Sequence, residues 1–296
     1  MSATITTTTA ATITTELQAT DPNYIPRGPV DAQLTFYLPP ADGSTPFRYV
    51  ETPPAGQPQL NYRTETKTVR IQDIRGREDE FHADTHGFEA VRGVQSATTR
   101  ATFDDDEEIK RVYYPEVKQL LLERVAPEAH KVVIFDHTVR RQDPGASRQP
   151  VTFAHGDQTD RAATMRVKLH VEDPEEAERL LQGRYRIINV WRPINGAVQQ
   201  APLALGSATS LKEGDMVPVE HRYPNRTGET LATRYSPDIE WYYLSGIDDD
   251  ERLIIKCSDS REDVAKRTPH TAFVDPRSPP GAKPRESIEV RCLVFG

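Results

Sequence analysis

The sequence predicts a mainly β protein with supporting helices, built on a jelly-roll or cupin-like core. Three observations favour this fold: many short strand-like segments, only two or three helical ones, and more Pro (24) than Gly (16), which favours frequent bends over long helices. The 296 residues are interpreted as one domain over residues 31–296, preceded by a flexible Thr-rich arm over residues 1–30. Periodicity alone does not separate this core from a β-sandwich.

Alternating or continuous apolar residues mark the expected strands. The segment at 131–135 (KVVIF) is typical of a buried strand, and the last one alternates before it becomes wholly apolar. The expected strands cover residues 33–37, 66–71, 131–135, 185–191, 239–244, 252–257 and 287–295.

Two segments have helical features. Residues 107–125 place most of their apolar side chains on one face, and Pro115 is expected to break or start that helix. The second helix has Asp173 as its N-cap, Pro174 in its first turn and Gly183 at its end. The acidic runs at 104–108 and 248–251 are interpreted as a solvated helix start and a turn rather than calcium sites.

The bulk composition excludes several classes of protein. The net charge of −8 (37 basic against 45 acidic residues) argues against nucleic-acid binding through phosphates. No run of about 18 apolar residues predicts a membrane span, and the N-terminus lacks the features of a secretory signal. Cys257 and Cys292 form no paired motif, which favours reduced thiols in the cytoplasm, although they could still bridge if their strands met. Homo-oligomerisation is left open.

A pair of potential metal ligands occurs in the segment VTFAHGDQ. His155 and Asp157 are separated by one residue, and residues i and i+2 of a strand point to the same face. An imidazole and a carboxylate can therefore converge there, while Gly156 leaves the opposite face uncrowded. One more histidine would complete the two-His-one-carboxylate set that binds Fe(II) and leaves positions open for a co-substrate and oxygen.

The C-terminal region supplies the third ligand and a candidate anion clamp. His270 is followed fifteen residues later by Arg285, and Arg285 and Ser287 share a strand face. A guanidinium with a neighbouring hydroxyl can hold the far carboxylate of a keto acid that chelates the metal through its other end. Arg291, on the same strand parity, and Arg192 are the alternatives for this clamp.

In these motifs the sequence resembles the Fe(II)/2-oxoglutarate-dependent dioxygenases, and more narrowly the fungal hydroxylase/desaturase group that includes gibberellin-desaturase-type enzymes. The resemblance extends from about residue 130 to the C-terminus. The family usually has a bulkier residue where this chain has Gly156, a difference that could widen the pocket or alter strand pairing. The matching segments are FDHTVR at 135–140, HGDQT at 155–159, NVWRPI at 189–194, WYY at 241–243, PHTAFVDP at 269–276 and RESIEVR at 285–291.

The resemblance implies a double-stranded β-helix, Fe(II), 2-oxoglutarate and O2 as reactants, and succinate and CO2 as by-products. The substrate would be a small secondary metabolite that is hydroxylated or desaturated. Two other hypotheses stay open: a cupin-type metal hydrolase or isomerase without 2-oxoglutarate, and a non-catalytic β-sandwich interaction protein. The remaining assignments are a scaffold or pocket-wall role for His137 and Arg140, core positions for Trp241, Tyr242 and Tyr243, a loop for His82 and His86, and surface positions for His130, His170 and His221.

Overall fold

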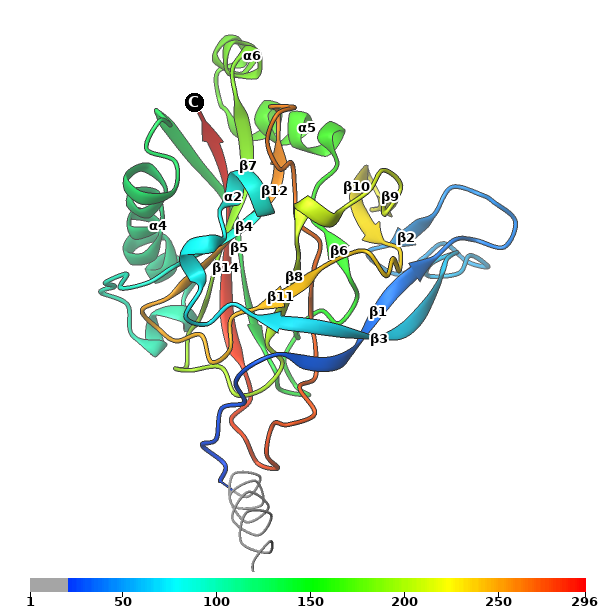
Figure 1. The fold of residues 1–296 in the computed structure, drawn as a ribbon. Helices are drawn as coiled ribbons and strands as arrows, with labels where there is room; N and C mark the ends of the chain where they lie inside the picture. The colour runs from blue at the N-terminus through cyan, green and yellow to red at the C-terminus, as the bar shows by residue number, and fades with distance from the viewer. Residues whose placement is uncertain (1–20) are drawn as a thin grey trace, which may run out of the picture.

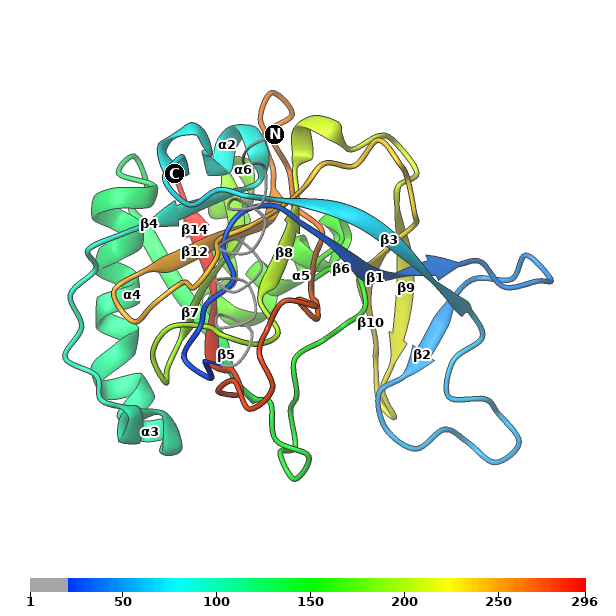
Figure 2. The same ribbon diagram turned by 60° about the horizontal axis from the view of Figure 1, so that its bottom comes forward.

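The computed structural model describes residues 21–296 and consists of two curled sheets that face each other (Figure 1, Figure 2). The larger sheet has the order β1-β3-β11-β8-β13-β6-β10-β9-β2, and the smaller one the order β4-β12-β7-β14-β5. The prediction of a mainly β protein with a jelly-roll, or double-stranded β-helix, core is confirmed. The strands are β1 (Val30–Leu38), β2 (Phe47–Tyr49), β3 (Arg63–Asp73), β4 (Phe88–Val91), β5 (Lys131–Arg141), β6 (His155–Gly156), β7 (Tyr185–Pro193), β8 (Leu203–Gly206), β9 (Met216–Arg222), β10 (Thr227–Thr233), β11 (Trp241–Tyr243), β12 (Arg252–Asp259), β13 (His270–Ala272) and β14 (Glu286–Phe295).

The central strand of the smaller sheet, β7, separates two environments. Ile188 and Val190 belong to the apolar cluster that packs beneath a helical segment, whereas Trp191 belongs to the cluster on the other face. Because side chains alternate along a strand, Asn189 lies on the same inner face as Trp191. The residues of β14 alternate in register beside them. Polar groups on these two strands can therefore reach the space between the sheets.

The helical segment that covers the outer face begins at α3 (Asp106–Glu108) and continues through α4 (Tyr114–Leu120) (Figure 1). A π-helical turn, Ile109–Tyr113, joins them, and a second one, Leu121–Val125, follows α4. Pro115 lies in the first turn of α4, directly after the π-helical turn, and thus starts α4 without ending the helical path. The acidic run begins the segment as expected, with Asp105 accepting hydrogen bonds from the backbone of Glu107 and Glu108.

Two further helices lie beyond β6 along the chain. The predicted helix is α6 (Pro174–Gln182), whose N-cap Asp173 accepts a 2.9 Å hydrogen bond from the backbone of Glu175. The other, α5 (Asp160–His170), was not predicted. Its apolar residues do not form one buried stripe, because Ala163 and Val167 are buried whereas Met165 and Leu169 are 51% and 67% exposed.

The structure describes only the last part of the predicted N-terminal arm, residues 1–30. Residues 1–20 lie outside the described part of the chain, but residues 21–29 contact the domain. Gly28 donates a backbone hydrogen bond of 2.8 Å to Asp73, and the Arg27 guanidinium lies 3.2 Å from the Ser245 hydroxyl. Arg277 donates to the backbone carbonyls of Arg27 and Pro29. These bonds hold the segment before β1 against the domain.

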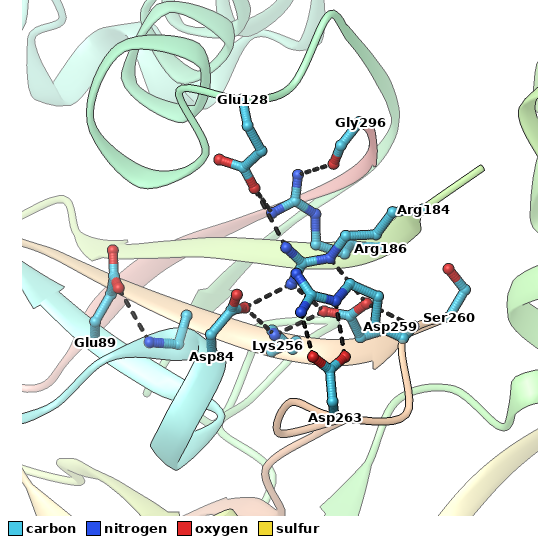
Figure 3. Close-up of polar contacts among 12 residues, drawn as sticks. Asp84, Glu89, Glu128, Arg184, Arg186, Lys256, Asp259, Ser260, Asp263 and Gly296 are labelled. Atoms are coloured by element: carbon cyan, nitrogen blue, oxygen red, sulfur yellow. Dashed lines mark hydrogen bonds and ion pairs between the residues drawn. The ribbon is translucent and has the colours of Figure 1, made fainter.

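A buried ionic network joins α2 (Ala83–His86) to β12 and to the start of β7 (Figure 3). Lys256 and Asp259 have side chains that are 1% and 0% exposed, and they pair at 2.7 Å. Arg184 contacts Asp84 at 2.7 Å and Asp259 at 2.6 Å, and Lys256 also contacts Asp84. Buried charges are tolerated only when paired, and here two cations face two carboxylates.

The two cysteines do not meet. Cys257 on β12 and Cys292 on β14 are separated by β7, and both are free and buried. Within residues 21–296, no helix has both the length and the apolar character needed to cross a membrane.

Candidate metal centre

The two histidines of the predicted metal site lie on neighbouring short strands. β13 pairs antiparallel with β6, and the register places His270 directly opposite His155. Their imidazole ring centres are 4.5 Å apart. The centre of the larger sheet thus brings together two residues that are separated by more than one hundred positions in the sequence.

Asp157 completes the cluster directly after β6. Its Oδ1 lies 3.6 Å from Nε2 of His155 and 4.0 Å from Nε2 of His270. One potential ligand atom from each residue lies within 4.8 Å of the other two. Gly156 turns to the opposite face, where a Cβ would lie 2.5 Å from the Met216 methyl group. The small residue therefore does not widen the pocket, because Met216 occupies the space behind it.

Hydrogen bonds to the backbone orient both imidazoles. Nδ1 of His155 donates to the carbonyl of Phe153 at 2.7 Å, and Nδ1 of His270 donates to the carbonyl of Thr268 at 3.3 Å. With Nδ1 protonated, the neutral ring presents the lone pair of Nε2, the form in which histidine binds a metal. Both Nε2 atoms point toward Asp157.

Two residues of the opposite sheet fix the carboxylate of Asp157. Its Oδ2 accepts a 2.7 Å hydrogen bond from Asn189 on β7 and a 3.4 Å contact from Nε of Arg291 on β14. Burial opposes ionisation of Asp157, but Arg291, then the neighbouring His270 and His155, favour the carboxylate form, so the pKa is well below its usual range. The carboxylate is thus ionised, with Oδ1 free to face a metal.

The protonation state of His155 also suits a ligand. Burial, together with the nearby His270, lowers its pKa to about 4, so the ring is neutral near pH 7. Two imidazoles and one carboxylate on the same side of an ion are the ligand set of non-haem Fe(II) oxygenases. The donor chemistry therefore fits iron.

Arg285 and Ser287 lie beside this cluster and have unsatisfied hydrogen-bonding atoms. Arg285 is 2% exposed, and the only hydrogen bond found from its side chain to the described residues goes from Nη1 to the carbonyl of Ala201. Its Nε and the hydroxyl of Ser287 are both buried without a partner among those residues. Burial and then the charge of Arg140 lower the pKa of Arg285 to about 9. Such a group favours an anion, so the residues fit a carboxylate.

A narrow cavity connects Arg285 to the histidines. Its volume is about 20 Å³, room for about one water molecule. An organic co-substrate therefore requires wall side chains to shift. Arg140 is suited to this, because within residues 21–296 the one hydrogen bond found for its guanidinium is a 3.1 Å bond to the exposed Gln149 carbonyl. The cavity is lined by Arg140, Val151, His155, Trp191, Leu203, His270, Ala272, Arg285 and Glu289.

The two alternative clamps have other roles. Arg291 is engaged by Asp136 at 2.9 Å and Glu289 at 2.7 Å, so its charge is already compensated. Arg192, expected to contact the co-substrate, does not line the cavity between Arg285 and the histidines. Arg192 lies on the outer face of β7, where it donates to Ser96 at 3.1 Å and packs against the ring of Phe103. Strand alternation directs it away from the metal centre.

The other assigned residues divide between scaffold and pocket. His137 bonds Tyr114 at 2.8 Å and Asp106 at 3.2 Å beneath the helical segment, which is a scaffold role. Trp241 and Tyr243 are buried, His130 is exposed, and Arg140 lines the cavity, all as expected. The segment of His82 and His86 forms the single turn of α2 rather than a loop.

A second, larger cavity borders Asp157, between α5 and the β9–β10 hairpin. It has a volume of about 480 Å³. His221 lies in its wall and bonds the Thr230 hydroxyl at 3.0 Å, so its expected surface position is wrong. His170, also expected at the surface, is half-buried and stacks on Phe135. Sequence reasoning missed both because neither β9 nor α5 was predicted.

Comparison with known proteins places the chain in a family. A family model described as an oxidoreductase/YMDC permease-like domain matches residues 34–295. The hydroxylase/desaturase poxK of Penicillium oxalicum is 34% identical over 91% of this chain and 92% of its own length. The Fe(II)/2-oxoglutarate-dependent dioxygenase nvfI of Aspergillus novofumigatus is 36% identical over 90% of this chain and 96% of its own.

A solved structure supports the same assignment. The iron and alpha-ketoglutarate-dependent endoperoxidase NvfI matches with a TM-score of 0.84 and 33% identity, covering 92% of this chain and 99% of that one. Fold, donor set and sequence similarity thus agree, and the chain belongs to the family of fungal Fe(II)/2-oxoglutarate-dependent hydroxylases and desaturases.

Proposed function

We propose that this enzyme binds Fe(II) through Nε2 of His155, Oδ1 of Asp157 and Nε2 of His270. The observation that carries the proposal is the convergence of these three ligand atoms within 4.8 Å. The backbone bonds to both Nδ1 atoms and the hold of Asn189 on Asp157 support it, since each orients a ligand before metal arrives.

Arg285 and Ser287 hold the far carboxylate of 2-oxoglutarate in this proposal. Their unsatisfied Nε and Oγ atoms supply donors inside a buried cavity, where a charge-assisted hydrogen bond is strong. Trp191 packs against the Arg285 guanidinium, with the charge 5.4 Å from the ring centre, and limits its movement. When bound, iron and 2-oxoglutarate use O2 to oxidise an unactivated C–H bond and release succinate and CO2.

The chain's own residues position the substrate and restrict water. A small-molecule substrate, as expected for a secondary-metabolite enzyme, occupies the larger cavity beside Asp157, and its reacting carbon faces the metal centre. The outcome is hydroxylation or desaturation. We also propose a cytoplasmic location, which the free thiols of Cys257 and Cys292 support.

The test compares Asp157→Asn with Asp160→Asn. Asp157→Asn removes the ligand charge, whereas Asp160 is a 62% exposed carboxylate three residues further on, paired with Arg267. The first variant should lose Fe(II)-dependent succinate formation, and the second should retain it. Undiminished succinate release by Asp157→Asn would rule out the ligand role.

An anaerobic titration separates the other candidate functions. Fe(II) plus 2-oxoglutarate should produce a weak visible charge-transfer band in wild type and none in Asp157→Asn. Tight metal binding without this band would favour a metal hydrolase or isomerase. The absence of tight Fe(II) binding would favour a non-catalytic protein.

A further inference from the structure

The larger cavity has mixed chemistry that indicates the kind of substrate it accepts. Its volume of about 480 Å³ lies within the usual range for small organic ligands. One wall presents Ala162, Met165 and Leu169 from α5, and Tyr223 lies on the side of the β9–β10 hairpin. Met165 and Leu169 are exposed on an otherwise polar helix surface, so an apolar ligand body would cover them.

Two cations of this cavity lack an anionic partner. Arg166 of α5 lies over the Phe135 ring at 5.2 Å, and its Nη1 is 3.4 Å from Nε2 of His170. Arg226, between β9 and β10, lies over the Tyr223 ring at 3.9 Å. In the described residues 21–296, neither guanidinium has a carboxylate oxygen within 4.0 Å.

The other cations of the same cavity are paired. Arg161 contacts Glu229 at 3.0 Å, and Lys168 contacts Glu178 at 2.7 Å. Asp136 is the nearby carboxylate that could serve Arg166, but it pairs with Arg291 at 2.9 Å. The missing partners are therefore specific to Arg166 and Arg226.

The two unpaired charges also act on each other. Burial, and then the positive charge of Arg226, lower the pKa of Arg166. An anion between them would relieve this repulsion, and guanidinium groups bind carboxylates well in partly desolvated sites. Asp157 lines the same cavity, so a ligand held by the two arginines lies beside the metal centre.

We propose that Arg166 and Arg226 bind a carboxylate of an otherwise apolar substrate, whose uncharged end is thereby directed toward Asp157 and the metal centre. This inference rests on the proposed function, because it names the class of substrate for that site. The substrate class is an apolar acid of small-metabolite size.

The experiment measures binding rather than turnover. Dansyl-undecanoate, a fluorescent apolar carboxylate, is titrated into Mn(II)-loaded protein, and its methyl ester is the uncharged comparison. Arg166→Gln and Arg226→Gln should each weaken binding of the acid by about tenfold to a hundredfold, the usual effect of losing one charge-assisted hydrogen bond. Binding of the ester should be weaker than that of the acid and unchanged by either substitution.

Lys168→Gln is the matched control, because it removes one positive charge from the same helix and cavity but from a paired residue. It should leave the affinity for the acid unchanged, and Arg166→Lys should retain part of it. Equal binding of acid and ester, or insensitivity to both arginine substitutions, would overturn the proposal. Weakened affinity for 2-oxoglutarate with unchanged probe binding would overturn it too, by assigning the arginines to the co-substrate. If the wild-type protein formed no succinate with Fe(II), the proposed function would be rejected, but the binding result would still stand.

Discussion

Replacing Arg285 with Gln should stabilise the protein while weakening its affinity for 2-oxoglutarate. The Arg285 guanidinium is almost fully buried, with the Ala201 carbonyl as its hydrogen-bond acceptor and an unsatisfied Nε. A lowering of its pKa from 12.5 to about 9 corresponds to roughly 5 kcal/mol of unfavourable burial of the charge. Gln removes the charge and keeps an amide that can donate to Ala201.

The net gain should be smaller than this burial term. The substitution also loses the packing of the cation on Trp191, worth roughly 0.5–2 kcal/mol, and one hydrogen bond to a charged group, worth roughly 1.5–3 kcal/mol. We expect the free energy of unfolding to rise by about 1–2 kcal/mol without co-substrate. The affinity for 2-oxoglutarate should fall by about tenfold to a hundredfold, since the carboxylate loses its cation.

Urea denaturation measures the first effect, and the 2-oxoglutarate KM of succinate formation measures the second. Arg277→Gln provides the contrast, because Arg277 pairs with Asp275 at 2.7 Å and donates to carbonyls of the N-terminal segment. That variant should lose stability and keep its KM. If Arg285→Gln instead destabilised the protein and left KM unchanged, Arg285 would be a structural residue and the reasoning would be refuted.

Three further outcomes are expected. Asn189→Leu should weaken metal affinity by about tenfold to a hundredfold in a Mn(II) titration, because it removes the hydrogen bond that orients Oδ2 of Asp157. Ile188→Val, on the outer face of the same strand, should leave metal affinity unchanged. Equal effects of the two substitutions would contradict the orienting role of Asn189. Asp259→Asn should remove part of the acid sensitivity of stability. The pKa of Asp259 is below its ordinary value near 4 despite burial, because Arg184 and Lys256 pair with it. The ionised carboxylate therefore stabilises the fold above about pH 4, and this stabilisation is lost as pH falls toward the folded-state pKa. Denaturation midpoints from pH 7 to pH 3 check this, and parallel curves for both proteins would argue against it. Gly156→Ala should retain metal binding and lose less than about 2 kcal/mol of stability in urea denaturation, because the atom closest to the new methyl is the flexible end of Met216 and Leu231 lies at ordinary contact distance. Loss of the metal would show that β6 cannot adjust.

The parts of the site that lie on strands were predictable because strand geometry is local. The i, i+2 spacing of His155 and Asp157 placed both on one face, and the same rule placed Arg285 and Ser287 together. Buried strands such as β7 and β14 were also predictable from long apolar runs. The pairing of His270 with His155 is different, because it depends on strand order in the sheet. The family motif order predicted that meeting, and periodicity could not.

The rest depended on contacts between distant segments. The sequence alone did not show which face of the strand the Arg192 side chain lies on. In the structure, it lies on the outer face, under the helical segment. The helix α5 has no single apolar stripe because one side faces the core and another the larger cavity. Asn189 carried no ligand signal of its own and Arg291 was predicted only as an alternative clamp, because the importance of both comes from Asp157 on the opposite sheet.

The short strands β6 and β13 connect the two halves of the larger sheet, with β1, β3, β11 and β8 on one side and β10, β9 and β2 on the other. They contribute only two and three residues, and a single pair, His155 with His270, joins them. A metal ion held by both imidazoles would therefore link the two halves of this sheet where a single residue pair joins them. Iron binding should then slow amide hydrogen exchange first in β6 and β13. Loss of iron would expose these two strands before the rest of the molecule unfolds.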